Sequence, residues 1–341
     1  MRPRLAILPT AARCLFAVVL ASCLSAFAPR SFATEDQAPP GDSFLARRPA
    51  TAVSFPRLSR LQNWADEEKD KDNSEAAGKS GDKEGADKNG DKEEDEDAEE
   101  EKPLESDRPD FTESSSTVGD KVLQIESGYT YTHAIAGAPA VDEHDLPELL
   151  VRYGVAERLE LRLEWEGWLF DHSSDRTAAG SQDVNGSSDT EFGFKYALTK
   201  QQKWRPQAAV LVGVTAPVGA PAFSSRQVDA RIAYLYSWEL TKKLSLACST
   251  GNLWTGETDD RFSYLYQSAS LDYELTERLH CFNEFYAWFR RDSLDNRTQS
   301  YYNGGLTFLV TKNFQVDWRA GWGLNDASDR FFTGCGLTIR K

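Results

Sequence analysis

The chain has 341 residues, and its 39 Lys and Arg against 54 Asp and Glu give a formal net charge of −15. This acidic balance argues against a nucleic-acid partner, because phosphate binding needs a basic surface. The length allows one large domain or two ordinary ones. The chain contains no Walker, Rossmann or zinc-ligand spacing, so we expect no cofactor, no bound metal and no enzyme of those classes.

Residues 1–33 are predicted to form a secretory signal peptide. Arginines occur within residues 2–13, a short apolar run covers 14–24, and a small-x-small cleavage site stands at 31–33. The apolar run is shorter than the roughly 20 residues that a membrane-spanning helix needs. Lipoprotein processing at Cys23 is an alternative. Both routes export the chain.

Residues 34–103 are predicted to be disordered. Within them, residues 66–102 hold 18 Asp and Glu against 7 Lys, a net charge of −11, and no aromatic or branched aliphatic side chain. Such a segment cannot bury enough apolar surface to offset its chain entropy. We interpret it as an acidic linker that lies in the periplasm.

Residues 104–341 are predicted to be the folded domain, because they contain all 12 Tyr and 8 of the 9 Trp. Alternating apolar and polar runs are separated by short turns near 156, 199, 241, 276 and 311, and longer Gly, Ser, Asp and Asn-rich links separate the remaining runs. An even strand number with short turns at one end and long loops at the other is typical of outer-membrane barrels. Twelve strands are expected near 121–133, 146–154, 159–170, 190–198, 206–216, 227–238, 243–251, 261–274, 279–290, 299–310, 314–324 and 331–340.

The stretch LELRLEWEGWL, residues 159–169, shows how these strands would face. Its leucines, including Leu169, and Trp165 share one parity, and its charged residues share the other. Since a strand sends alternate side chains to opposite faces, the apolar parity would face lipid and the charged parity the lumen. Tyr and Trp near strand ends, such as Tyr264 and Tyr266, resemble the aromatic girdle of a membrane interface. The fold class expected is therefore all-β: an antiparallel up-and-down transmembrane β-barrel.

The charged residues on the inward parity are candidates for lining the lumen. Rings of such side chains set selectivity in pores. The candidates are Glu126, Glu148, Arg152, Glu160, Arg162, Glu164, Glu166, Glu191, Lys195, Asp229, Arg231, Glu284, Asp317 and Arg319.

The domain opens with Asp107, Arg108, Pro109, Asp110 and Phe111, in the block DRPDFTE…VG…QIESGYTY. This block, with a YGV…RLELR segment and the Leu-Thr-x turns, resembles the outer-membrane transporter family named for the meta-pathway of phenol degradation. The resemblance covers about residues 107–341. It implies a channel-like barrel that passes aromatic or other hydrophobic compounds.

The lumen has two interpretations. A narrow channel for passive passage of small solutes is favoured, with residues 107–117 folding into the periplasmic mouth as a gate. Alternatively, the charges pair and plug a structural or adhesive barrel; a barrel-embedded lipid-modifying enzyme is a third, weaker hypothesis. The expected partners are outer-membrane lipid, small solutes and the barrel-assembly machinery.

Overall fold

The computed structural model describes residues 48–49, 56–57, 104–134, 140–174, 181–257, 260–291 and 297–341. The predicted signal peptide and almost all of the predicted disordered region, including the acidic linker, lie outside these residues. Two-residue strands β1 (Arg48–Pro49) and β2 (Pro56–Arg57) pair with each other. No helix in the described part of the chain is long and apolar enough to cross a membrane.

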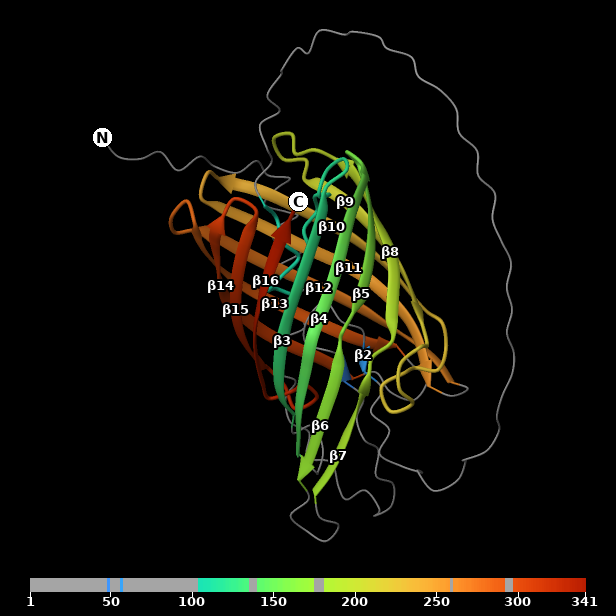
Figure 1. The fold of residues 1–341 in the computed structure, drawn as a ribbon. Coiled ribbons are helices and arrows are strands. Elements are labelled where there is room, and N and C mark those ends of the chain that lie inside the picture. Colours follow the sequence, from blue (N-terminus) through green and yellow to red (C-terminus); the bar gives the residue numbers. More distant parts are fainter. Residues whose placement is uncertain are drawn as a thin grey trace, which may run out of the picture. The chain divides into compact units, whose positions relative to one another are not determined.

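The remaining described strands form one antiparallel sheet that closes on itself, because β3 pairs with both β4 and β16 (Figure 1). The strands are β3 (Leu123–Ala134), β4 (Ala140–Ala156), β5 (Leu159–Trp165), β6 (Trp168–Ser174), β7 (Ser181–Ser187), β8 (Thr190–Thr199), β9 (Gln207–Ala216), β10 (Asp229–Thr241), β11 (Leu244–Glu257), β12 (Asp260–Glu274), β13 (Leu279–Arg291), β14 (Thr298–Thr311), β15 (Phe314–Gly323) and β16 (Phe331–Arg340).

The fourteen strands of this sheet occupy twelve positions around the barrel, and we call each position a stave. β5 and β6 both pair with β4 and form one interrupted stave, as do β8 and β7, which pair with β5 and β6 in turn. The first interruption lies at Glu166 and Gly167, opposite Pro147, which has no backbone N–H to give to the ladder. The expected up-and-down barrel of about twelve strands is confirmed.

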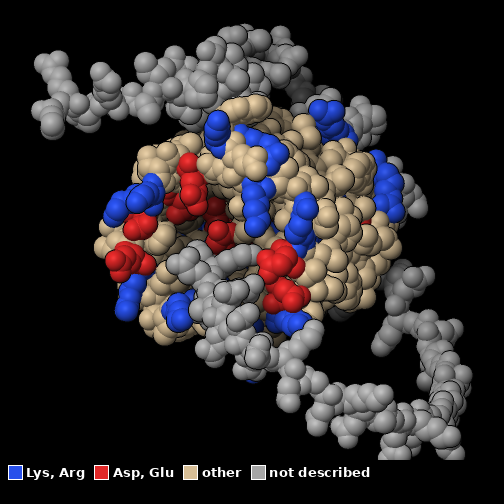
Figure 2. Space-filling model, turned by 90° about the horizontal axis from the view of Figure 1, so that it is seen from above, with Lys and Arg blue, Asp and Glu red and all other residues tan. Residues whose placement is uncertain are grey.

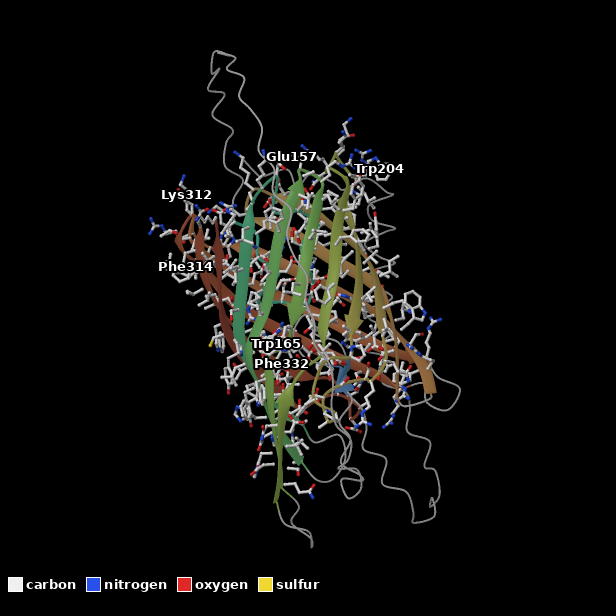
Figure 3. The ribbon with its side chains drawn as sticks, turned by 45° about the vertical axis from the view of Figure 1, so that its right-hand side comes forward. Glu157, Trp165, Trp204, Lys312, Phe314 and Phe332 are labelled. Carbon is white, nitrogen blue, oxygen red and sulfur yellow. The ribbon has the colours of Figure 1, made fainter. Side chains whose placement is uncertain are left out.

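The two ends of the barrel differ. The short turns and the last residue of the chain gather at one end, where Figure 3 places Glu157, Trp204 and Lys312. Figure 2 looks onto this end and shows Lys and Arg side chains around its edge. The other end carries the longer links, of which residues 217–228 fold back so that Gly219 and Ser225 donate backbone hydrogen bonds to the Asp189 carboxylate.

The outward face is apolar along most staves, as the alternation predicts. On β8, Phe192 is 58% exposed while its neighbour Glu191 is 2% exposed, and on β15 Trp318 is 50% exposed while Arg319 is fully buried. An apolar surface continued around a closed sheet suits contact with lipid rather than water. Each strand from β8 through β16 pairs on both sides, whereas β7 pairs with β6 alone.

Three details differ from the sequence expectations. Leu169 is buried and its neighbours Trp168 and Phe170 are exposed, so the interruption at Gly167 reverses the parity of this stave. Residues 181–187, expected within a long loop, form β7. Tyr264 and Tyr266, interpreted as part of an outer girdle, are 2% and 3% exposed and lie in the inner core cluster. The inward parity of β12 is therefore the aromatic one.

Alternation along the strands places Cys248, Cys281 and Cys335 on the apolar parity, which predicts small lipid-facing side chains. Cys281 is half-buried, Cys335 is exposed, and none of these three cysteines forms a disulfide. Cys248 is fully buried instead, because Tyr236, directly opposite on β10, packs with it in an outer-face cluster.

Candidate functional site: a charged lumen filled by the N-terminal segment

Residues 104–118 enter the barrel interior before β3 begins, and we call them the inner segment. Leu104, Asp107 and Phe111 are all at most 7% exposed. The segment forms no strand, so its buried N–H groups need other partners. The amides of Asp107, Phe111 and Val118 donate to Glu126, Glu284 and Glu160 of the barrel wall, at 3.0, 2.9 and 2.9 Å.

One side of the interior is basic, and we call Arg152, Arg162, Lys195 and Arg231 the basic arc. Asp107 of the inner segment is fully buried against it. Its carboxylate contacts Arg162, accepts a 2.9 Å hydrogen bond from Lys195 Nζ, and lies 3.6 Å from Arg152 Nη1. The carboxylate also accepts the Ser114 N–H at 2.8 Å, which turns the segment back on itself.

Glu113 is the second carboxylate that the inner segment presents to the basic arc. Its Oε1 accepts hydrogen bonds from Arg162 Nη2 at 3.1 Å and from Arg231 Nη1 at 3.2 Å. The strands themselves supply four further carboxylates in contact with the arc, those of Glu126, Glu160, Glu164 and Glu191. The wall thus supplies carboxylates to the three arginines of the arc, and the inner segment adds Glu113 and the Asp107 carboxylate that pairs with Lys195.

Arg108 reaches a neighbouring part of the interior, where carboxylates of β4 and β15 lie. Its guanidinium contacts Glu148 on β4, lies 3.6 Å from Asp317 on β15 and donates to the Cys335 carbonyl on β16 at 3.3 Å. Gly128 makes room for it, because a Cβ there would lie 2.2 Å from Arg108 Nη2. At these three residues the inner segment is complementary to the wall, because Asp107 and Glu113 face the basic arc and Arg108 faces acids.

Phe111 occupies a set of rings on β12 and β13, Tyr266, Tyr286 and Trp288, which we call the aromatic cage. Its ring stacks on Tyr286 at 4.4 Å between centroids and meets Tyr266 and Trp288 edge-on at 5.7 and 5.3 Å. Thr112, the next residue, donates through both N–H and Oγ1 to Glu284 Oε1 at 2.6 Å. These contacts hold the middle of the segment deep in the lumen.

Neighbouring groups lower the pKa of one acidic side chain of the inner segment and raise the pKa of another. Burial alone would raise the pKa of Asp107, but the charges of Arg152, Lys195 and Arg162 outweigh it and hold that pKa well below its usual value. Burial raises the pKa of Asp110 well above its usual value, and the nearby carboxylates of Glu284 and Asp272 raise it further. Although burial alone would lower it, Glu148 and Asp317 raise the pKa of Arg108, which stays charged.

The structure buries twelve of the fourteen wall residues that the sequence singled out and leaves Glu148 and Glu166 half-buried. It brings most of them into the two charged groups described above. Asp229 lies apart, where it accepts a 2.9 Å hydrogen bond from Thr255 and is 4.0 Å from Arg261, and Glu166 lies at the interruption of its stave.

The motif from Asp107 to Phe111, expected to fold into the periplasmic mouth, contacts wall residues inside the barrel. Glu113 and the aromatic cage were not singled out. Glu113 stands in the same DRPDFTE block, which was a usable signal. The cage residues come from two strands and carry no motif.

A closed antiparallel barrel with an apolar outer face and a charged interior is the architecture of outer-membrane β-barrel proteins. The chain belongs to the family described as putative MetA-pathway of phenol degradation, whose sequence profile matches residues 106–340. This confirms the resemblance seen in the opening block. No curated protein was found to match the chain.

The barrel is similar to solved outer-membrane structures. One is the COG4313 outer membrane channel from Pseudomonas putida F1, with a TM-score of 0.55 and 13% identity over 67% of this chain and 98% of that one. Another is the NanC porin, with a TM-score of 0.42 and 12% identity over 64% of this chain and 98% of the porin. At these identities the likeness concerns the fold.

Proposed function

We propose that the protein is an outer-membrane channel for the passive passage of small solutes, with the inner segment as its gate. The observation that carries this proposal is the charge-complementary contact between the wall and a segment that is not part of the wall. A barrel that needed only structural filling would be served by strand side chains that pair with one another, as Arg152, Arg162 and Arg231 already do with the four wall glutamates.

The inner segment could leave the lumen without disrupting the barrel wall. It is joined to the wall at β3, where Lys121 N donates to the Gly154 carbonyl at 2.8 Å, and its other contacts are side-chain hydrogen bonds, ion pairs and ring contacts. Its withdrawal would leave the sheet ladder intact. In this proposal the short-turn end faces the periplasm, so that the acidic linker before residue 104 lies there too.

The solute class follows from the lining and from the family. The family description refers to phenol degradation, and the COG4313 structure is described as a channel. The aromatic cage offers ring surfaces inside the barrel, which suits small aromatic or hydrophobic solutes. These considerations support passage of such compounds.

The experiment is single-channel conductance in planar bilayers, for the full chain and for a variant lacking residues 105–117. We expect the full chain to conduct in brief openings and the deletion variant to conduct continuously and more strongly. Resistance to trypsin, and gel migration that changes when the sample is heated, would show that both barrels are folded. Equal conductance of two folded proteins would remove the gate from the proposal.

A second function, a structural or adhesive barrel with a sealed lumen, is favoured by the dense packing around Phe111 and Asp107. Burying charge is costly unless it is paired, and here it is largely paired. The same experiment separates the two functions, because a sealed structural barrel whose segment never leaves gives no current from the full chain under any solute gradient. Hydrolysis of phospholipid by the purified protein would favour the enzyme hypothesis.

A further inference from the structure

Two side chains of the inner segment, Phe111 and Glu113, occupy neighbouring parts of the lumen that differ in chemistry. The Phe111 ring lies in the aromatic cage, stacked on Tyr286. The Glu113 carboxylate lies between two guanidinium groups, those of Arg162 and Arg231, at 3.1 and 3.2 Å. Together they present a ring and a carboxylate, two residues apart, to a ring site and a cation site.

Strand register explains why the two sites adjoin. Ala233 on β10 pairs with Gly251 on β11, which pairs with Tyr266 on β12, and Tyr266 pairs with Trp288 on β13. Arg231 lies on β10 two residues from Ala233, on the same face of the strand. The row of paired residues that contains Tyr266 and Trp288 is therefore two residues along the strands from the row that contains Arg231.

Tyr266 spans the distance between the cage and Arg231 because Gly251 carries no side chain. A Cβ on Gly251 would lie 2.2 Å from Tyr266 Cζ and 2.4 Å from its hydroxyl oxygen. The Tyr266 ring therefore lies across β11 and points toward β10. The ring fills the space between the other cage residues and Arg231 of the basic arc.

The cage also carries hydrogen-bonding groups that the protein does not use. The Tyr266 hydroxyl, the Tyr286 hydroxyl and the Trp288 Nε1 are buried without a hydrogen-bond partner among the described residues. Their side chains are 3%, 1% and 3% exposed. Buried polar groups without partners are costly, and a ligand that brings polar atoms into this place would lower that cost.

We propose that these two sites form one binding site for a small aromatic carboxylate, whose ring replaces Phe111 and whose carboxylate replaces that of Glu113 when the inner segment withdraws. The inference rests on the proposed function, since it names the solute class of the gated lumen. In it, the inner segment is a competitor built into the chain, and the solute and the segment exclude each other.

The cation site is the reason to expect a carboxylate rather than a neutral ring. When the segment leaves, Arg162 keeps Glu160 and Glu164, and Arg231 keeps Glu164 and Glu191. Both guanidinium groups nevertheless lose the hydrogen bonds that they donate to Glu113, and buried charged donors that lose an acceptor are costly. A solute with a carboxylate returns one partner to Arg162 and Arg231. A neutral aromatic compound fills the cage alone and leaves this electrostatic cost in place.

The test uses the full chain with two substitutions, Phe111→Ala and Glu113→Ala, which remove both side chains from the two sites without deleting the segment. Phenylacetate binding is measured by titration calorimetry in detergent. Benzyl alcohol supplies the ring without the carboxylate, and acetate supplies the carboxylate without the ring. The matched control carries Phe192→Ala and Glu239→Ala, which make the same chemical changes at exposed positions.

We expect the double variant to bind phenylacetate at least tenfold more tightly than benzyl alcohol or acetate, and at least tenfold more tightly than the wild type or the control does. Adding Trp288→Leu should weaken binding of all ring compounds, and adding Arg231→Gln should weaken phenylacetate alone. Heat-modifiable migration on gels identifies the folded variants.

Two results would overturn the inference. Equal affinity for benzyl alcohol and phenylacetate would show that the cation site takes no part, and absence of binding to a folded double variant would show that there is no such site. Neither result depends on conductance. The channel proposal fails separately, when a folded variant lacking residues 105–117 binds phenylacetate and carries no current.

Discussion

Replacing Asp107 with asparagine tests how the inner segment is held. The structure describes one carboxylate in ion-pair contact with Lys195, that of Asp107, whereas Arg152 and Arg162 keep partners such as Glu160 and Glu164. Breaking a buried ion pair by removing one partner costs about 3–5 kcal/mol. The lower end applies here, because asparagine keeps the shape and an oxygen for the Ser114 N–H.

A loss of about 3 kcal/mol corresponds to a shift of roughly 100-fold toward the withdrawn segment. The assay is the open probability of single channels in planar bilayers. The control is Asp120→Asn, which removes the same charge from an exposed pair with Lys121, where such a pair contributes about 0–1 kcal/mol. An open probability in Asp107→Asn equal to that of Asp120→Asn would refute the reasoning.

The sign of the pH effect makes this test stricter. Because the pKa of Asp107 is lowered in the folded protein, its stabilising contribution is present above the ordinary carboxyl value of 3.8 and is lost only as the pH falls through the lower, folded pKa. The difference between Asp107→Asn and the wild type should therefore stay constant from pH 8 to pH 5. A difference that fades across that interval would mean that Asp107 is not the ionised partner of the basic arc.

Three further predictions concern other parts of the barrel. Asp110 has a raised pKa, so its contribution to holding the segment in the lumen is complete below its ordinary pKa and is lost as the pH rises toward the folded pKa. The open probability of the wild type should therefore rise with pH, and Asp110→Asn should flatten that dependence. An unchanged slope in Asp110→Asn would mean that Asp110 does not cause the pH dependence. Arg108→Gln leaves Glu148 and Asp317 without this cation and should raise cation selectivity in reversal-potential measurements, while Arg226→Gln in an exposed loop should not. Phe194→Arg, mid-stave and 38% exposed, should cost about 2–4 kcal/mol in urea unfolding from lipid vesicles, and Leu198→Arg, on the same face beside the short turn, about 0–1 kcal/mol; equal costs would mean that this face does not lie in lipid.

The barrel and its facing could be predicted because two-residue periodicity is a local property. Leu161 is 49% exposed and Glu160 fully buried, as the alternation from residue 159 requires. The pattern fails where local signals are absent. Gly167 interrupts the ladder and reverses the parity of Leu169, and nothing in the preceding alternation announces this.

Strand composition accounts for two other differences. β7 has the sequence SQDVNGS, which has low strand propensity, and it is a strand because its whole length pairs with β6. On β12, aromatic and small polar residues stand on the same parity as Tyr264 and Tyr266, so hydropathy alone does not identify the inner face. The Phe111 ring defines it, since it meets Tyr266 edge-on.

The charged site was partly predictable. Inward charges follow from parity, so the members of the basic arc were identified one strand at a time. Their pairing with Asp107 and Glu113 joins residues 55 and 118 positions apart, as for Asp107 with Arg162 and Glu113 with Arg231. Such contacts follow from barrel closure and have no local signature, so the sequence alone did not predict them.

The contacts of Arg108 bear on the order in which the barrel assembles. This residue precedes the first stave, yet it touches Glu148 on the second and Cys335 on the last, 227 positions further along the chain. Contacts of such long sequence separation need the largest loss of chain entropy and form late. The seam between β3 and β16 therefore closes around a lumen that the segment enters with, or after, closure. Substitutions in the segment should then hasten unfolding in stopped-flow measurements while leaving the folding rate nearly unchanged.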